Sequence, residues 1–255
     1  MRISTLGLHG FCAMRVIRKA FDAVEALEAS VNTGCVDSEL MRLLAAPVRE
    51  SHYVSNNLWQ MLRIANEIAY RSDGVFDIAA SGTAGAAVWT DIDLSVKNFV
   101  RLNKPLRLEL KSIAKGYAVD VAVRALEEAG VGRGIVDLDG CIRAFGPQEW
   151  RIHFNLGVMG ETSLPITLRG GALACFGPGY GETALYDTRK GMLRAREELG
   201  ASNVIVRAPS AALANSLTGV AALMQADAAK VLKGLGARGL VLTPDGPRLL
   251  ESALS

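Results

Sequence analysis

Residues 112–120 read Ser-Ile-Ala-Lys-Gly-Tyr-Ala-Val-Asp, and they stand where a predicted strand at 106–110 meets a predicted helix at 113–130. The first turn of a helix has free backbone N–H groups, and the helix dipole adds positive potential, so such a junction suits an anion. The spacing is consistent with Lys115 beside a phosphate and Asp120 accepting hydrogen bonds from a ligand. An ordinary helix start, with a surface lysine and an aspartate on the helix face, fits the same spacing.

Composition and charge restrict the classes of partner. The chain has 255 residues, of which 50% are hydrophobic and 21% are charged, which is typical of a globular protein. The formal net charge is only +2, and no basic stripe with interleaved aromatic residues occurs, so we expect no nucleic acid partner. No stretch reaches the roughly 20 apolar residues of a membrane span, and no signal peptide pattern is present. We therefore expect no membrane partner and a cytoplasmic location, while the apolar fraction permits a homodimer.

The four cysteines, Cys12, Cys35, Cys141 and Cys175, are far apart in the chain, and none belongs to a Cys-x-x-Cys pair. This spacing favours reduced, buried thiols over a zinc site or a disulfide framework. A catalytic Cys175 is the alternative, but a reactive thiol needs a base or a positive neighbour, and none is evident nearby in the sequence.

Hydrophobic patterning predicts an α+β fold. Phe11 and Met14 begin an apolar stripe with helical spacing, and other segments alternate as strands do. The predicted elements alternate without the regular βαβ period of a doubly wound sheet, so we expect one domain over residues 1–255, with antiparallel sheets and packed helices. The helices are expected at 11–31, 37–44, 55–71, 113–130, 210–224 and 226–235, and the strands at 3–8, 98–102, 106–110, 134–138, 150–156, 163–168, 173–176, 203–207 and 239–243.

The run Leu108-Glu109-Leu110-Lys111-Ser112-Ile113-Ala114-Lys115-Gly116-Tyr117-Ala118-Val119-Asp120 resembles a signature of the ApbE family, Leu-Asp-Leu-Gly-x-Ile-Ala-Lys-Gly-Tyr-Ala-Val-Asp. Further segments resemble family motifs in the family's order, so the resemblance extends over roughly the whole chain. These segments are Ser-Glu-Leu at 38–40, Ser-Asp-Gly-Val-Phe-Asp at 72–77, Val-Asp-Leu-Asp-Gly at 136–140, and Ala-Pro-Ser-Ala-Ala-Leu-Ala-Asn-Ser-Leu at 208–217.

The resemblance implies an ApbE-like fold and a family activity. Members of this family split FAD and attach FMN to a threonine or serine of a target protein through a phosphoester, with magnesium. By resemblance, FAD would bind at Ala114, Lys115, Gly116, Asp120 and Gly140. Any metal would be held by the carbonyl of Ala114 with Asn215 and Thr218. A flavin nucleotide and a target protein are the implied partners.

The chain departs from the family pattern at positions that the resemblance marks as chemical. Asn215 stands where the family has a metal-binding aspartate, and magnesium prefers the charge of a carboxylate. Gly219 stands where the family has a threonine, although the preceding residue in this chain is Thr218. Ala184 replaces a histidine that is the family's candidate base, and alanine cannot take a proton.

Two further departures concern residues that could contact a ligand. Cys175 and Phe176 replace two hydroxyl residues, and Asp139 replaces a glycine. We therefore assign no catalytic residue and doubt a family-type magnesium site. Three hypotheses follow: a transferase with altered metal use, a protein that only binds FAD or another nucleotide, and an interaction module.

Overall fold

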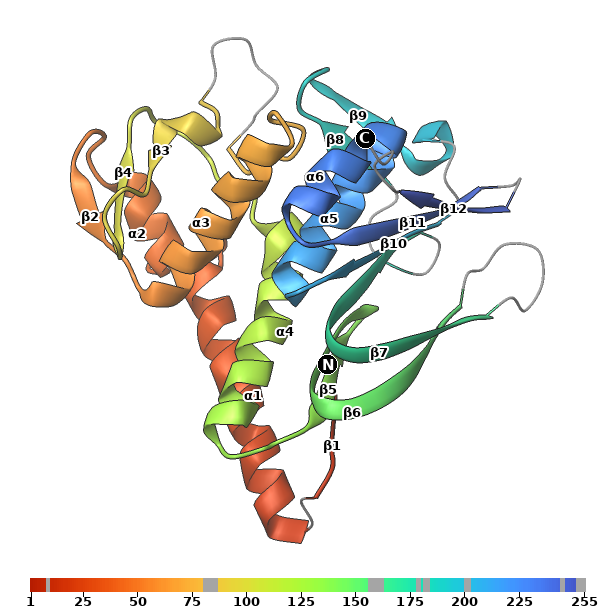
Figure 1. Ribbon diagram of the computed structural model, residues 1–255. Helices are drawn as coiled ribbons and strands as arrows, with labels where there is room; N and C mark the ends of the chain where they lie inside the picture. The colour runs from red at the N-terminus through yellow and green to blue at the C-terminus, as the bar shows by residue number, and fades with distance from the viewer. Residues whose placement is uncertain are drawn as a thin grey trace.

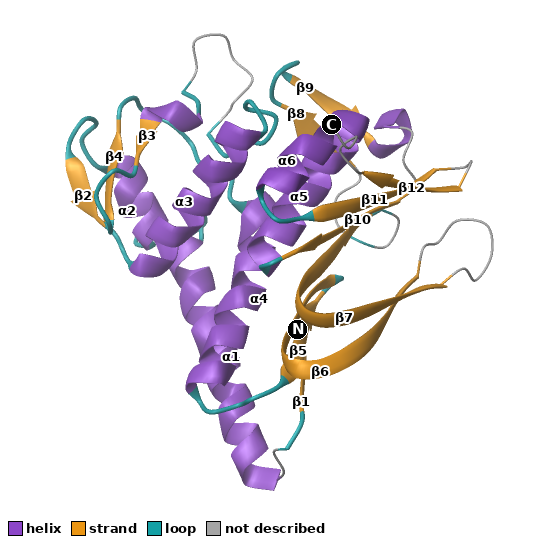
Figure 2. Ribbon diagram, viewed as in Figure 1, coloured by secondary structure: helices purple, strands orange, loops and turns teal. Residues whose placement is uncertain are grey.

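A computed structural model describes residues 1–7, 10–79, 87–155, 163–177, 180, 184–199, 203–243 and 246–250. Figures 1 and 2 show a long, twisted sheet with helices packed along one face, and a small sheet beyond those helices. The helices are α1 (Gly10–Val31), α2 (Glu39–Ala45), α3 (Asn56–Arg71), α4 (Lys111–Glu128), α5 (Ala211–Met224) and α6 (Ala228–Gly234). Short 3-10 turns lie at Trp89–Asp91, Arg196–Leu199 and Gln225–Asp227.

The main sheet has seven strands in the order β1-β5-β6-β7-β10-β11-β12, and neighbouring strands are antiparallel. Its strands are β1 (Arg2–Thr5), β5 (Gly134–Leu138), β6 (Cys141–Asn155), β7 (Ser163–Phe176), β10 (Asn203–Ala208), β11 (Arg238–Thr243) and β12 (Gly246–Leu250). The small sheet pairs β2 (Ser51–Tyr53), β4 (Phe99–Leu102) and β3 (Ile92–Asp93) in that order. A separate hairpin joins β8 (Ala184–Asp187) to β9 (Met192–Ala195).

A two-residue turn joins β5 to β6 and faces the C-terminal end of β7. Leu138 pairs with Cys141, and Cys141 pairs with Ala174, so the turn lies beside the last residues of β7. Asp139 and Gly140 have φ angles of 49° and 75°, the left-handed pair that a tight hairpin requires. A Cβ on Gly140 would lie 2.4 Å from the Tyr180 ring, so this position needs glycine for space as well.

The packing of α4 against α5 forms the centre of the core. Tyr117 and Val121 of α4 are buried, and α4 carries buried residues on nearly every face because α1, α5 and the sheet surround it. Gly116 allows the closest approach, since a Cβ there would lie 2.2 Å from the carbonyl oxygen of Ala211. The glycine is therefore a requirement of helix packing.

The α+β class predicted from the sequence is confirmed, and a serine caps the start of each of two predicted helices. Ser55 and Ser210 accept hydrogen bonds from the backbone N–H groups of Leu58 and Leu213. The strand predicted at 106–110 is wrong, because that segment pairs with no strand. Its buried Leu108 and Leu110 pack into the core from an extended connection.

Three further predictions from the pattern need correction. Phe11 and Met14 are 78% and 68% exposed, because the first turns of α1 extend past the body of the molecule (Figure 1). Cys12 and Cys35 are exposed, whereas Cys141 and Cys175 are buried as expected. The strands predicted at 163–168 and 173–176 are one continuous strand, β7.

Within the described residues, no helix combines the length and the apolar character needed to cross a lipid bilayer.

Replacing Gly116 with alanine is expected to lower the free energy of unfolding by about 2–3 kcal/mol, because the new methyl group would displace α5 from α4. Urea denaturation of the purified chain measures this. Gly219→Ala on α5 is the matched control, since its Cβ would meet only the Leu185 side chain at 3.6 Å. The control substitution should raise the free energy of unfolding by up to about 1 kcal/mol, because alanine has a higher helix propensity than glycine. Equal effects of the two substitutions would contradict the packing role of Gly116.

Candidate functional site

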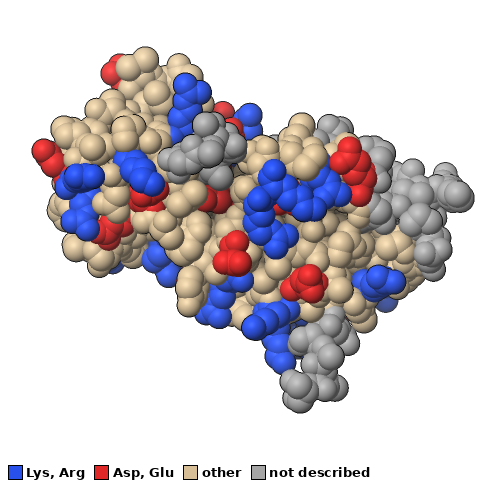
Figure 3. Space-filling model, turned by 90° about the horizontal axis from the view of Figure 1, so that it is seen from above, with Lys and Arg blue, Asp and Glu red and all other residues tan. Residues whose placement is uncertain are grey.

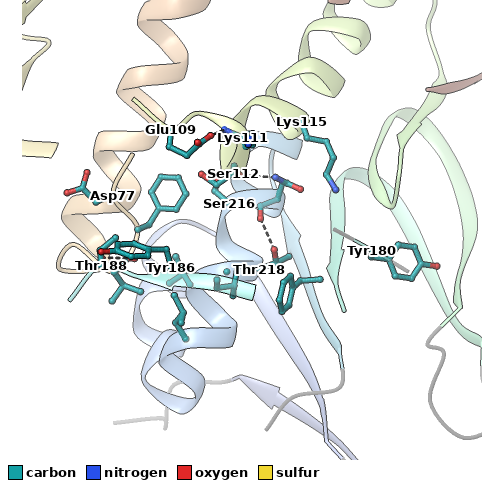
Figure 4. A pocket seen from close by; sticks show the side chains of 18 of the residues that line it. Asp77, Glu109, Lys111, Ser112, Lys115, Tyr180, Tyr186, Thr188, Ser216 and Thr218 are labelled. Carbon is teal, nitrogen blue, oxygen red and sulfur yellow. Dashed lines mark hydrogen bonds between the residues drawn. The ribbon is translucent and has the colours of Figure 1, made fainter. Parts of the chain in front are cut away.

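A cavity of about 410 Å³ lies where the N-terminus of α4, the middle of α5, the end of β7 and the start of the β8–β9 hairpin meet. Figure 4 shows Lys115 and Tyr180 at one end of this pocket, Asp77, Tyr186 and Thr188 at the other, and Ser216 and Thr218 between them. The residues that line it are Val75, Phe76, Asp77, Glu109, Lys111, Ser112, Lys115, Asp139, Cys175, Phe176, Tyr180, Leu185, Tyr186, Thr188, Asn215, Ser216, Thr218, Gly219, Val220 and Leu223.

The N-terminus of α4 gives one end of the pocket a positive character. Lys111 and Lys115 line the pocket one helical turn apart, and the Lys115 ammonium donates to the carbonyl oxygen of Asp139 at 3.3 Å. Leu110 at the N-cap position has no side-chain acceptor, and the first turn contains no acidic residue. Glu109 accepts from the Lys111 N–H at 3.3 Å. Lys111, Lys115 and the helix dipole therefore lie where the sequence predicts an anion, and the carboxylates of Glu109 and Asp139 line the same pocket.

Asp120 has a role within the protein that the sequence prediction did not assign. Its side chain is only 6% exposed, and its two carboxylate oxygens accept from the N–H groups of Ala211 and Ala212, each at 2.9 Å. Arg143 of β6 donates to the same carboxylate at 2.5 Å. The carboxylate thus caps α5, and Asp120 does not line the pocket. Its contact with a cofactor therefore stays a prediction from the resemblance.

Of the other predicted cofactor residues, some lie at the pocket and others pack inside the protein. Lys115 lines the pocket, whereas Gly116 is buried against the first residue of α5. Ala114 lies inside the first turns of α4, where its N–H donates to the carbonyl of Leu110. Gly140 shapes the turn that places Asp139 and Tyr180 at the pocket. Only Lys115 of the five predicted residues therefore has a side chain facing the pocket.

The predicted metal ligands form hydrogen bonds with one another and with α4. The side-chain amide of Asn215 donates to the carbonyl oxygen of Ser112 at 2.8 Å, and the hydroxyl of Ser216 donates to the same oxygen at 3.2 Å. Thr218 donates to the carbonyl of Asn215 at 2.8 Å. The carbonyl that accepts from Asn215 is thus that of Ser112, and the metal contact of the Ala114 carbonyl stays a prediction.

A magnesium ion does not suit this set of donors. Mg²⁺ requires oxygen ligands and is usually held by one or two carboxylates together with phosphate. Asn215 presents its N–H end to Ser112, so this residue could offer a cation only its neutral Oδ1 and no carboxylate charge. In the part of the chain that the structure describes, no group of three or more His, Cys, Asp or Glu could hold a metal.

Apolar and aromatic side chains form the rest of the wall. Phe76 and Phe176 are 8% and 5% exposed, and both line the pocket together with Tyr186 and Leu185. Thr188, at the start of the β8–β9 turn, donates to the carbonyl oxygens of Gly74 and Val75. This contact joins the hairpin to residues 72–77, a segment singled out in the sequence by its motif.

Two pocket residues, Tyr186 and Thr188, were not predicted from the sequence. They lie two and four residues after Ala184, the residue at the start of β8 where the chain departs from the family pattern, and no local pattern distinguishes them. The side chain of Asp77 also reaches this end of the pocket, where it accepts from the N–H groups of Ala79 at 2.8 Å and Trp89 at 3.0 Å. Long-range contacts between residues 72–79 and the hairpin thus create the second end of the pocket.

The histidines and the buried cysteine offer little chemistry to the pocket. Among the described residues, no histidine lines it: His52 contacts the carbonyl of Pro47 at 3.0 Å, and His153 lies on β6. His9 lies outside the described residues. Burial raises the pKa of the Cys175 thiol to about 12, although the nearby charge of Lys115 acts in the opposite direction. Cys175 is therefore almost entirely a neutral thiol near pH 7, which agrees with the prediction of a buried cysteine in the core.

The surrounding surface carries mixed charge. On the face shown in Figure 3, acidic side chains lie among the lysines and arginines, so the basic groups do not form one continuous surface on that face. The two lysines that line the pocket, Lys111 and Lys115, both belong to the N-terminal part of α4.

Comparisons with known proteins identify relatives of this chain. Residues 2–88 and 82–177 match the model of the family described as "ApbE family". A Rhodobacter capsulatus protein named FAD:protein FMN transferase is 26% identical over 147 residues, covering 45% of this chain and 28% of that protein. The match thus spans less than a third of that relative's length.

Solved structures share the fold at low sequence identity. Flavin transferase ApbE from Vibrio cholerae superposes with a TM-score of 0.76 at 19% identity, covering 98% of this chain and 93% of the other. The ApbE protein of Thermotoga maritima gives the same TM-score and identity, with coverages of 98% and 92%. The apo flavinyl transferase ApbE of Pseudomonas stutzeri gives 0.73 at 18% identity, with coverages of 92% and 86%.

Replacing Asp120 with alanine is expected to lower the free energy of unfolding by about 3 kcal/mol, because two helix N–H groups and a half-buried arginine lose their acceptor. Chemical denaturation monitored by circular dichroism measures this. Asp22→Ala is the control, since it removes an exposed ion pair with Arg18 that contributes at most about 0.5 kcal/mol. A cost for Asp120→Ala as small as that of the control would argue against the capping role.

Thiol titration at pH 8 should separate the four cysteines into two classes. Cys12 and Cys35 are exposed and should react quickly with a disulfide reagent. Cys141 and Cys175 should react only after denaturation, because burial raises the pKa of each thiol to about 12. Fast labelling of Cys175 in the folded chain, identified by peptide mass, would revive it as a nucleophile.

Proposed function

The chain belongs to the ApbE family, and from that premise we propose that it binds FAD in the pocket at the N-terminus of α4. The observation that carries this proposal is the difference between two adjacent helix N-termini. At the N-terminus of α5, two N–H groups donate to the buried carboxylate of Asp120, whereas at α4 Glu109 accepts only from the Lys111 N–H and the helix opens into a pocket lined by Lys111 and Lys115. An external anion would pair with these two lysine side chains.

The phosphates of FAD are proposed to lie at the lysine end of the pocket. A helix N-terminus attracts phosphate through its N–H groups and its dipole, and each lysine adds a charge-assisted hydrogen bond. Lys115 is held in place by its contact with the carbonyl of Asp139, so its ammonium is already directed across the mouth of the pocket. A phosphate here would gain both contacts without a large rearrangement.

A flat ring system is proposed to lie against the aromatic wall. Phe76, Phe176 and Tyr186 offer apolar surface within the same cavity, about 410 Å³ in volume. That volume falls in the range of about 300–1,000 Å³ that is common for small-molecule sites. A ligand with phosphate at one end and an aromatic ring at the other matches this division, and FAD has both features.

We propose that FMN transfer, the activity named for the Rhodobacter capsulatus relative, is slow or absent in this chain. A protein hydroxyl must lose a proton to attack phosphorus, and a positioned base usually contributes about 10²–10⁴-fold to such a step. Ala184 stands at the family's histidine position, and no described histidine lines the pocket. A target protein is a partner of this chain only if transfer occurs.

Lys115→Ala is expected to weaken FAD binding by about tenfold, because one charge-assisted contact with phosphate is lost. Quenching of flavin fluorescence on titration with the protein measures the affinity. Lys97→Ala is the control, since this exposed lysine is not part of the pocket and should leave the affinity unchanged. The proposal fails if the unaltered chain does not quench FAD, or if both variants bind equally well.

Mass spectrometry tests the second part of the proposal. Incubation with FAD, magnesium and a peptide carrying an acceptor threonine should leave the peptide mass unchanged over hours. Addition of FMN to the peptide at a rate typical of an enzyme would instead identify the chain as an active transferase.

A further inference from the structure

The hydrogen bond between Asn215 and Ser112 joins α5 to the first turn of α4 at the pocket. The Asn215 amide nitrogen lies 2.8 Å from the Ser112 carbonyl oxygen, and the Ser216 hydroxyl donates to the same oxygen. We propose that the Asn215 N–H group takes the place of a divalent cation between these helices, so that the pocket binds its phosphate ligand without metal.

The chemistry of the contact explains why asparagine succeeds here without a cation. A carbonyl oxygen only accepts hydrogen bonds, so it pairs with the NH₂ end of the asparagine amide. An ionised aspartate offers only acceptors, and at this position it would set two oxygen atoms against each other. Two acceptors at that spacing repel unless a cation lies between them.

The spacing also matches what a cation would impose. Two oxygens in neighbouring positions of an octahedron around Mg²⁺ lie roughly 3 Å apart, since each is about 2.1 Å from the metal. The observed separation of 2.8 Å between Asn215 and Ser112 is close to that value. One N–H···O bond therefore holds the helices at nearly the distance that a shared metal would set.

Three other carboxylates near the pocket accept hydrogen bonds from backbone N–H groups. Asp77 accepts from two backbone N–H groups, and Asp187 is 1% exposed and accepts from the N–H of Lys190. Glu109 accepts from the N–H of Lys111. Asp139 also lines the pocket, so the positive charge facing a phosphate comes from Lys111 and Lys115 and is partly offset by that carboxylate. This part of the inference rests on the proposed binding of FAD.

Thermal unfolding of Asn215→Asp tests the inference without any flavin. In EDTA, the variant should melt about 3–8 °C below the unaltered chain, because a hydrogen bond is replaced by repulsion. Millimolar Mg²⁺ should restore most of this loss in the variant and leave the unaltered chain within about 1 °C of its EDTA value. A magnesium-dependent melting temperature of the unaltered chain would overturn the inference, as would a variant that Mg²⁺ does not rescue.

Asn98→Asp is the matched control for this experiment. The Asn98 amide also donates to a backbone carbonyl, that of Val54 at 3.3 Å, but it lies in the small-sheet region away from the pocket. This control should lose stability in EDTA without recovering in Mg²⁺. Equal rescue of both variants would show a general salt effect and would count against a specific site at Asn215.

FAD titration separates the inference from the proposed function. The unaltered chain should bind FAD with the same affinity in EDTA and in Mg²⁺, within about twofold. If FAD binds only with Mg²⁺, the inference fails and the proposed function stands. If FAD binds under neither condition, the proposed function fails, and the melting experiment still decides whether Asn215 replaces a cation.

Discussion

The carboxylate of Asp120 is the contact on which the rest of the structure depends. Asp120 lies near the middle of α4, and its carboxylate accepts hydrogen bonds from the first two N–H groups of α5 and pairs with Arg143 of β6. One side chain thus fixes two helices and a strand relative to each other. Because it is buried, its hydrogen bonds are strong and its loss would leave three donors without an acceptor.

The N-termini of α4 and α5 differ in the charge that surrounds them. Asp120 supplies α5 with a buried carboxylate from within the chain, while Lys111 and Lys115 lie in the first five residues of α4, and Glu109 accepts only from the Lys111 N–H. Gly116 brings the two helices close enough for both effects to occur side by side. The anion site and the internal cap are therefore two results of the same helix packing.

The pocket combines family-like elements with a different set of polar contacts. The chain matches the ApbE family model and shares its fold with solved ApbE structures. At Asn215, an amide-to-carbonyl hydrogen bond joins α4 and α5. In this chain, a hydrogen bond between neutral groups thus holds the two helices together at the pocket.

The sequence by itself determined the α+β class, most of the helices and the placement of Lys115 near the start of α4, because these depend on periodicity, capping residues and a contiguous motif. It misjudged residues 106–110 as a strand, since alternation records burial and not hydrogen-bond partners. Tertiary structure alone decided that Asp120 caps α5, that Ser112 and not Ala114 faces Asn215, and that Tyr186 and Thr188 complete the pocket. The physical reason is that each of these roles is set by a partner about 90 or more residues away in the chain, and no local pattern identifies that partner.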